Sequence, residues 1–189
     1  MDQNGDLKER LLQIVEEQLI EHGYHDMSVD AIAAAAGISK KTLYVVFRSK
    51  QEMAEQVLDR VFERLDLEMD KVKALPDPIE RFRRGELVVE EIISPIERKA
   101  MLRRPFFWHR IERMNKQRLS YIMDLFREAQ AKGLIRSDFS PEILAVGYAA
   151  GVKALADHRN RIQYSYSFKA AAEQIVNVFL EGLKPRSLS

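Results

Sequence analysis

The residues whose chemistry stands out lie in the stretch AAAAGISKKTLYVVF, residues 33–47. Lys40 and Lys41 are adjacent cations, and Thr42 and Tyr44 add two hydroxyl groups to the same short segment. Residues 31–50 contain four basic side chains and no acidic one, whereas residues 1–30 contain two basic and eight acidic ones. A basic segment beside an acidic one can direct one surface toward a polyanion such as a nucleic acid. A solvated basic turn is the alternative interpretation.

Two short helices are predicted to position these side chains. Ser28 and Ser39 are typical N-cap residues, and the pattern that follows them predicts helices over 29–36 and 40–46. Gly37 can adopt the positive φ that a tight Gly-Ile-Ser turn requires. Two short helices joined by such a turn form a helix-turn-helix, whose second helix enters the major groove of DNA. The alanines at 33–36 are expected to let the two helices cross closely.

The predicted DNA contacts come from the starts of both helices and from the outer face of the second. Lys40 and Lys41 lie where such helices meet base edges, while hydroxyl groups and Lys50 can contact phosphates. Val45 either contacts a thymine methyl group or belongs to the core, and core is the interpretation favoured for Val46. The predicted DNA-binding residues are Ser28, Ser39, Lys40, Lys41, Thr42, Tyr44, Val45 and Lys50, with Gly37 as the turn residue.

Helix start and stop signals recur along the whole chain, and strand signals are nearly absent. Asp77-Pro78-Ile79-Glu80 and Ser94-Pro95-Ile96-Glu97 both have the form of a capping box with proline at the first helical position. The sequence therefore predicts an all-α fold of about nine helices. Their expected ranges are 7–22, 29–36, 40–46, 50–74, 78–93, 95–103, 105–132, 141–158 and 166–182.

Composition argues against several classes of protein. No apolar run approaches the roughly 20 residues of a membrane span, and the N-terminus has no apolar signal-peptide core. There is no cysteine, which excludes disulfides and thiolate chemistry. The four histidines, His22, His25, His109 and His158, are scattered without metal-ligand spacing, and no glycine-rich phosphate loop is present. We therefore expect no catalytic residue, no metal and no cofactor.

The second part of the chain carries less specific patterns. Gly147 and Gly151 form a ridge of small residues on a largely apolar helix, which suits close helix packing either within one chain or between two. The predicted dimer-interface residues are Gly147, Gly151, Leu155, Ile175 and Phe179. Residues 98–118 contain eight basic side chains and one acidic one, interpreted either as a solvated face or as a site for an anionic ligand.

Aromatic residues cluster in PFFWHR, residues 105–110, and continue along the following helices. A stripe of large apolar side chains at helical spacing is the ordinary pattern of a core. The alternative is an apolar pocket with a few polar groups for orientation. The residues of this candidate effector pocket are Phe107, Trp108, His109, Tyr121 and Tyr148.

The segment GYHDMSVDAIAAAAGISKKTLYVVFRSKQEM, residues 23–53, resembles the N-terminal domain of the TetR family of bacterial transcriptional regulators. Lys41, Val45 and Val46 depart from the residues that many relatives carry there, so the operator sequence does not transfer. The resemblance implies a DNA-binding domain over 1–50 and a helical domain for dimerisation and effector binding over 51–189.

The same resemblance implies a cytoplasmic homodimer that represses at a palindromic operator in double-stranded DNA. A small-molecule effector, apolar or anionic, would release it, and no membrane partner is expected. The alternative is an architectural or constitutive regulator whose C-terminal half only dimerises or binds a protein partner.

Overall fold

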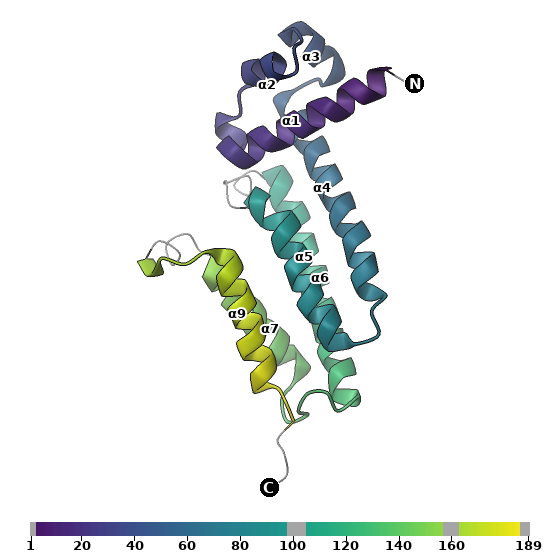
Figure 1. Cartoon of the computed structure of the whole chain (residues 1–189), viewed down its shortest axis with the longest axis vertical. Coiled ribbons are helices and arrows are strands. Elements are labelled where there is room, and N and C mark those ends of the chain that lie inside the picture. The colour runs from purple at the N-terminus through teal and green to yellow at the C-terminus, as the bar shows by residue number, and fades with distance from the viewer. Residues whose placement is uncertain (1–2, 98–104, 157–162, 186–189) are drawn as a thin grey trace. The chain divides into compact units, whose positions relative to one another are not determined.

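The computed structural model describes residues 3–97, 105–156 and 163–185, and its helices are shown in Figure 1. In this part of the chain there are eight helices and no strand, which confirms the all-α prediction and comes close to the predicted number. No helix here is both long and apolar enough to cross a bilayer. The helices are α1 (Gln3–Asp26), α2 (Val29–Ala35), α3 (Lys40–Val46), α4 (Lys50–Lys73), α5 (Pro78–Glu97), α6 (Pro105–Ala131), α7 (Pro141–Ala156) and α9 (Phe168–Gly182).

Helix α5 corrects one prediction. The capping-box pattern at Ser94–Glu97 predicted a new helix there, but α5 continues from Pro78 through Pro95 to Glu97. A proline inside a helix removes a single backbone donor and often kinks the helix, but it need not end it where packing holds the turns on both sides. The remainder of the predicted helix, residues 98–103, lies outside the described residues.

The chain groups into two compact units whose boundaries pass through α4, α5 and α6. One unit comprises residues 1–69 and 89–111, and the other comprises residues 70–88 and 112–189. The first contains α1 to α3 and most of α4, and the second contains α7 and α9. The domain boundary predicted at residue 50 remains a prediction.

In the first unit, α1 precedes the two short helices and α4 follows them, and ion pairs join α1 to α4. Arg60 and Arg64, two residues of α4, pair with Glu9 and Glu16 of α1. Near its C-terminus α1 is kinked at Gly23, where φ is 76° and ψ is 169°. This is the position at which the sequence predicted a helix stop, and only glycine adopts such a conformation without strain.

In the second unit, α7 and α9 lie side by side (Figure 1). Their shared core contains four aromatic rings whose contacting centroids are 4.9–5.9 Å apart: Phe82, Phe126, Tyr148 of α7 and Phe179 of α9. Tilted and edge-on ring pairs of this kind add favourable quadrupole interactions to the burial of apolar area. Tyr148, a candidate pocket residue, is thus part of this core and is 1% exposed.

Glu142, in the first turn of α7, gives this unit a pH-dependent contact. Hydrogen bonds from the Ser140 hydroxyl and from Arg127 lower the pKa of its carboxyl group from 4.5 to about 2. A folded-state pKa below the unfolded value stabilises the fold above pH 4.5, and the contribution is lost as pH falls toward 2. We therefore expect the Glu142 carboxyl resonance to titrate near pH 2 in an NMR experiment, and E142Q to remove this part of the acid sensitivity. Titration near pH 4.5 would contradict the assignment.

Candidate nucleic-acid interface

The helix-turn-helix forms as its caps predict. The Ser28 hydroxyl accepts a hydrogen bond from the backbone N–H of Ala31 at 3.2 Å, which caps α2. The Ser39 hydroxyl accepts the corresponding bond from Thr42 at 3.0 Å, which caps α3. Between the helices Gly37 has a φ of +66°, the left-handed conformation for which glycine was predicted. Local sequence signals therefore determine where both helices begin.

A small apolar core holds α3 against its neighbours. Ile32, Leu43 and Phe47 are all fully buried, and Ile38 of the turn is half-buried. Only two of the four alanines face this core: Ala33 and Ala36 are buried, whereas the two between them are exposed. The close helix crossing thus rests on residues 33 and 36, the positions that share one face of α2.

Because Leu43 and Phe47 define the inner face of α3, residues on the opposite side of the helix define its outer face. Lys41 and Val45 are four residues apart and point away from the core. Val45 is 81% exposed and Tyr44 is 42% exposed, whereas Val46 is half-buried. This exposure argues against a core role for Val45 and agrees with one for Val46. The outer face thus presents a cation, a methyl-bearing surface and a phenol.

Two of the predicted lysines have partners within the chain. Both carboxylate oxygens of Asp30 lie 3.1 Å from the Lys40 ammonium nitrogen. The Lys50 ammonium donates to the carbonyl of His25 at 2.9 Å and lies 5.3 Å from the centre of the Tyr24 ring. Lys50 therefore closes the end of α1, in addition to any contact with DNA. By contrast, Lys41 is exposed and has no partner among the described residues.

The hydroxyl groups of Ser39 and Thr42 also interact with each other, 2.9 Å apart. Each remains exposed, so both keep hydrogen-bonding capacity for a phosphate oxygen. These two side chains, both predicted as DNA contacts, therefore lie together at the start of α3.

Sequence reasoning missed two basic residues around this surface. Arg10 of α1 donates to the carbonyl of Ala36 and so holds the C-terminal end of α2 against α1. Arg48 follows α3 and has an exposed side chain, while its backbone N–H donates to Glu52 at 2.6 Å. The count of basic residues in 31–50 includes Arg48, and this was the signal that could have identified it.

Residues 12–57 match the family described as bacterial regulatory proteins, tetR family. This range contains the whole helix-turn-helix with its caps and the start of α4. The helix-turn-helix region of this chain thus matches the TetR family.

Curated relatives match part of the chain. The regulator EthR of Mycolicibacterium smegmatis is 34% identical over 85 residues, which are 43% of this chain and 39% of the relative. EthR of Mycobacterium tuberculosis is 34% identical over 79 residues, 41% of this chain and 37% of the relative. The matched region thus spans about two fifths of the length of these curated relatives. All are described as transcriptional regulators.

Solved structures resemble the fold over nearly the whole chain. A putative transcriptional regulator from Saccharomonospora viridis, in complex with choline, superposes with a TM-score of 0.79 and 19% identity, covering 96% of this chain and 100% of the other. The ketosteroid transcriptional regulator KstR2 of Mycobacterium tuberculosis superposes with a TM-score of 0.69 and 21% identity, covering 95% of each chain. At these identities the likeness concerns the fold.

The candidate effector residues are not gathered into one described pocket. The side chains of Phe107 and Trp108 lie outside the described residues, and His109 is exposed. Tyr148 is in the core, where its hydroxyl donates to Glu86 at 2.7 Å. Burial, and secondarily the Glu86 carboxylate, raise the pKa of Tyr148 far above its ordinary value, so that this hydroxyl remains a donor.

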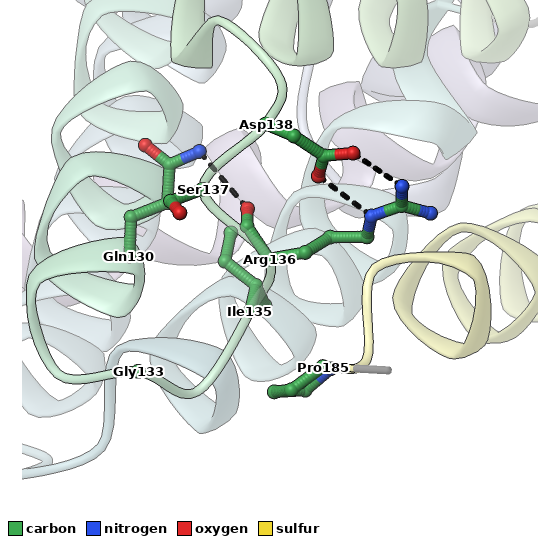
Figure 2. Close-up of a pocket in the computed structure, with 7 residues that line it drawn as sticks. All are labelled: Gln130, Gly133, Ile135, Arg136, Ser137, Asp138 and Pro185. Atoms are coloured by element: carbon green, nitrogen blue, oxygen red, sulfur yellow. Dashed lines mark hydrogen bonds and ion pairs between the residues drawn. The ribbon is translucent and has the colours of Figure 1, made fainter. Parts of the chain in front are cut away.

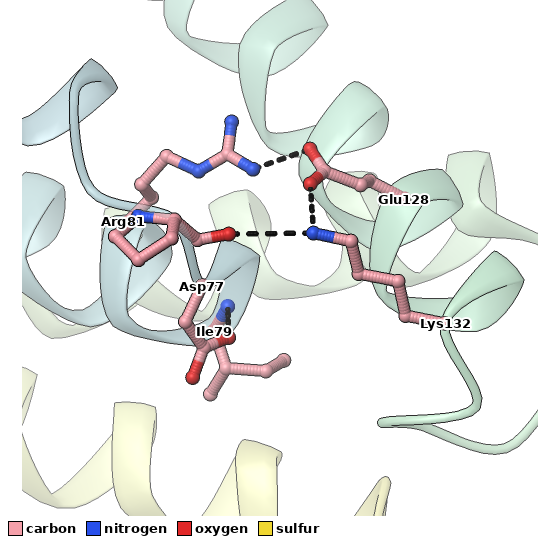
Figure 3. Close-up of polar contacts among 6 residues, drawn as sticks. Asp77, Ile79, Arg81, Glu128 and Lys132 are labelled. Atoms are coloured by element: carbon pink, nitrogen blue, oxygen red, sulfur yellow. Dashed lines mark hydrogen bonds and ion pairs between the residues drawn. The ribbon is translucent and has the colours of Figure 1, made fainter.

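Tyr121, the fifth of these residues, lies near Arg81. Arg81 belongs to a polar cluster with Glu128 of α6 and with Lys132, which follows that helix (Figure 3). Glu128 binds both Arg81 and Lys132, and Lys132 also donates to the Pro76 carbonyl at 3.3 Å. Hydrogen bonds from Lys132 and then Arg81 lower the pKa of Glu128. Burial raises the pKa of Tyr121, whose hydroxyl has no hydrogen-bond partner among the described residues.

A pocket that the structure does form lies elsewhere, at the connection between α6 and α7 (Figure 2). Of the candidate effector residues whose side chains the structure describes, His109, Tyr121 and Tyr148, none lines it. Its polar groups bind one another: the Gln130 amide donates to the carbonyl of Arg136 at 3.1 Å, and Arg136 pairs with Asp138. These contacts stabilise the connection after Gly133, whose φ is +67°.

The candidate dimer residues divide into exposed and inward-facing groups. Gly147 is exposed, and a Cβ atom added to it would meet nothing within 4 Å. Gly151 instead faces α9, where an added Cβ would lie 4.0 Å from Ile175. Ile175 and Phe179 pack against the core of their own chain, and Leu155 is half-buried. Ile143, Val146 and Val178, which the sequence analysis did not select, are 71%, 52% and 70% exposed.

Proposed function

We propose that the protein is a sequence-specific DNA-binding transcriptional regulator that acts as a homodimer at a palindromic operator. This proposal rests on the outer face of α3. Lys41, Tyr44 and the 81%-exposed Val45 lie on this face without a partner in the described part of the chain, and Leu43 is buried on the opposite side. An exposed helix of this kind fits the major groove, and its side chains can contact base edges and phosphates.

Pairing of two chains is supported by the apolar surface of α7 and α9. Ile143, Val146 and Gly147 share one exposed face of α7, and Val178 is exposed on the adjacent α9. Solvent-exposed apolar residues grouped on neighbouring helices favour an interface over a free surface. A twofold interface of this type would place two copies of α3 one helical turn of DNA apart, about 34–36 Å.

We also propose that a small-molecule effector binds the protein and releases it from the operator, which ends repression. Its support is the match of residues 12–57 to the TetR family, together with the likeness in fold to a regulator solved in complex with choline. An effector acts by binding the released state more tightly than the DNA-bound state, because equal affinity would shift nothing. Phe107, Trp108, His109, Tyr121 and Tyr148 remain the proposed contacts. W108A is expected to abolish the response while leaving operator binding intact.

Footprinting tests the regulator function directly. The purified protein should protect a palindromic segment in the DNA upstream of its own coding sequence, and addition of a suitable metabolite should remove this protection. A titration over a range of salt concentrations distinguishes specific from general binding. Absence of a sequence-specific complex at every salt concentration would refute the proposal.

Replacement of Lys41 by alanine should weaken binding to operator and random DNA alike, if its ammonium contacts phosphate. The plot of log K against log salt should then flatten by about 0.9 per subunit, the contribution of one phosphate contact. A contact with a base edge should instead cost about 1–3 kcal/mol on the operator alone. Fluorescence anisotropy on both DNAs measures these quantities.

The exposed lysine Lys71 near the C-terminus of α4 supplies the control for Lys41. K71A removes the same charge from a helix outside the helix-turn-helix, and it should leave the salt dependence unchanged. An unchanged operator affinity and slope in K41A would contradict a contact between Lys41 and DNA.

A further inference from the structure

The ion pair between Asp30 and Lys40 has no evident role in stability. The Asp30 side chain is 76% exposed and the Lys40 side chain is 50% exposed. Exposed pairs of this kind contribute little to folding because water screens both charges. Asp30 is also the only acidic residue of α2, and it lies in the first turn of that helix beside the start of α3. Its position at the edge of the outer face of α3 suggests a role in what that face contacts.

The pair changes the chemistry that Lys40 offers to DNA. Both oxygens of Asp30 lie 3.1 Å from the ammonium nitrogen, so the lysine charge is locally balanced by a carboxylate. A phosphate approaching this ammonium would be repelled by Asp30. A neutral acceptor would not be repelled, and the ammonium retains N–H donors that the carboxylate does not use.

The major-groove edge of a G·C pair matches these two groups. Guanine presents the acceptors N7 and O6, which lysine binds, and cytosine presents the N4 amino donor, which aspartate accepts. We propose that Asp30 and Lys40 together recognise one G·C base pair in each half of the operator, and that Asp30 disfavours binding to random DNA. This inference rests on the proposed DNA-binding function and adds a specificity-determining residue that belongs to α2 rather than to α3.

The substitution D30N tests the inference, because it keeps the shape of the side chain and removes its charge. Freed from its partner, Lys40 becomes available to a phosphate. Affinity for random duplex DNA should rise about eightfold at 0.1 M salt, and the salt slope on that DNA should steepen by about 0.9 per subunit in contact. The ratio of operator to random affinity should fall about tenfold.

Selection from a randomised duplex library, with the wild-type protein and the variants in parallel, gives the base preference at each position. The wild-type selection should contain a G·C pair at one position of each half-site, and that preference alone should disappear in D30N and in K40Q. The double variant D30N/K40Q should lose no further preference beyond K40Q.

D66N is the matched control, because it removes one exposed acid of α4, about 24 Å along that helix from Lys50. It should change neither the base preference nor the salt slope. Circular dichroism verifies that every variant is folded.

The outcomes separate this inference from the proposed function. If the wild-type protein selects no sequence, both are overturned. If the wild type selects an operator but D30N retains its base preference and its random-DNA slope, the role of Asp30 is overturned and the regulator function stands.

Discussion

Replacement of Arg118 by methionine should lower the free energy of unfolding by about 3 kcal/mol. Arg118 binds Glu86 through two hydrogen bonds, one of them from Nε to Oε1 at 3.1 Å, and the Tyr148 hydroxyl donates to Oε2 of the same carboxylate at 2.7 Å. The Glu86 side chain is 9% exposed. Methionine would fill much of the volume but leave a buried negative charge with a single neutral donor.

The double variant E86Q/R118M isolates the cause. A neutral glutamine can still accept the Tyr148 hydrogen bond, and without a buried charge most of the lost stability should return. The exposed pair between Lys116 and Glu112 supplies the comparison, because K116M breaks an ion pair on the same helix at a cost of about 0–1 kcal/mol. Urea unfolding of the four proteins measures the differences. A value for R118M within 0.5 kcal/mol of wild type, on the scale of ordinary surface substitutions, would show that this carboxylate does not depend on its arginine.

The same network illustrates what the sequence could not disclose. Helix starts are local, and so Ser28, Ser39 and Gly37 identified the caps and the turn of the helix-turn-helix from their immediate neighbours. The partners of polar side chains are set by how helices cross. Tyr148 meets Glu86, a residue 62 positions earlier, and this contact has no periodicity that a sequence pattern could reveal.

The DNA-binding surface shows the same difference between local helix signals, which the sequence contains, and side-chain partners, which depend on how the helices cross. The bounds of α3 followed from its cap and its apolar spacing, as did the inward direction of Leu43. The pairing of Lys40 with Asp30 depends instead on the angle between α2 and α3, which the turn establishes only once Ala33 and Ala36 are packed. Counting charges treated Lys40 and Lys41 as equivalent, but the fold gives one of them an acidic neighbour.

Helix α5 contains a local helix-start signal that the structure does not follow. A serine and a proline followed by a glutamate form a local start signal, and yet α5 passes through Pro95 without ending. Local propensity is a weak prior that tertiary packing overrides. A proline in a helix interior costs about 3 kcal/mol, which the burial of a long amphipathic helix can offset. The signal was therefore ambiguous in the sequence and resolved only by packing.

Substitution of Gly147 by leucine should maintain or slightly raise the folding stability of a single chain, but it should weaken the association of two chains. A Cβ at this position meets nothing within 4 Å in its own chain, and leucine is a better helix former than glycine by about 0.5–1 kcal/mol. One chain should therefore tolerate the change or become slightly more stable. If the face formed by Ile143, Val146 and Gly147 lies against a second copy, the leucine would collide with that copy and the dimer should dissociate.

Dissociation should in turn reduce operator affinity by about 100-fold or more, because two linked recognition helices bind with an advantage that one helix lacks. V178D should have the same effect by placing a carboxylate in the interface, while its position, 70% exposed in a single chain, predicts little change in folding. L67D is the control, since Leu67 is 65% exposed but belongs to α4. Light scattering, thermal unfolding and anisotropy on the operator measure the three properties separately. A G147L or V178D protein that remains dimeric and binds the operator with wild-type affinity would exclude this face of α7 and α9 as the interface, because neither leucine nor aspartate can be accommodated there beside a closely packed second copy.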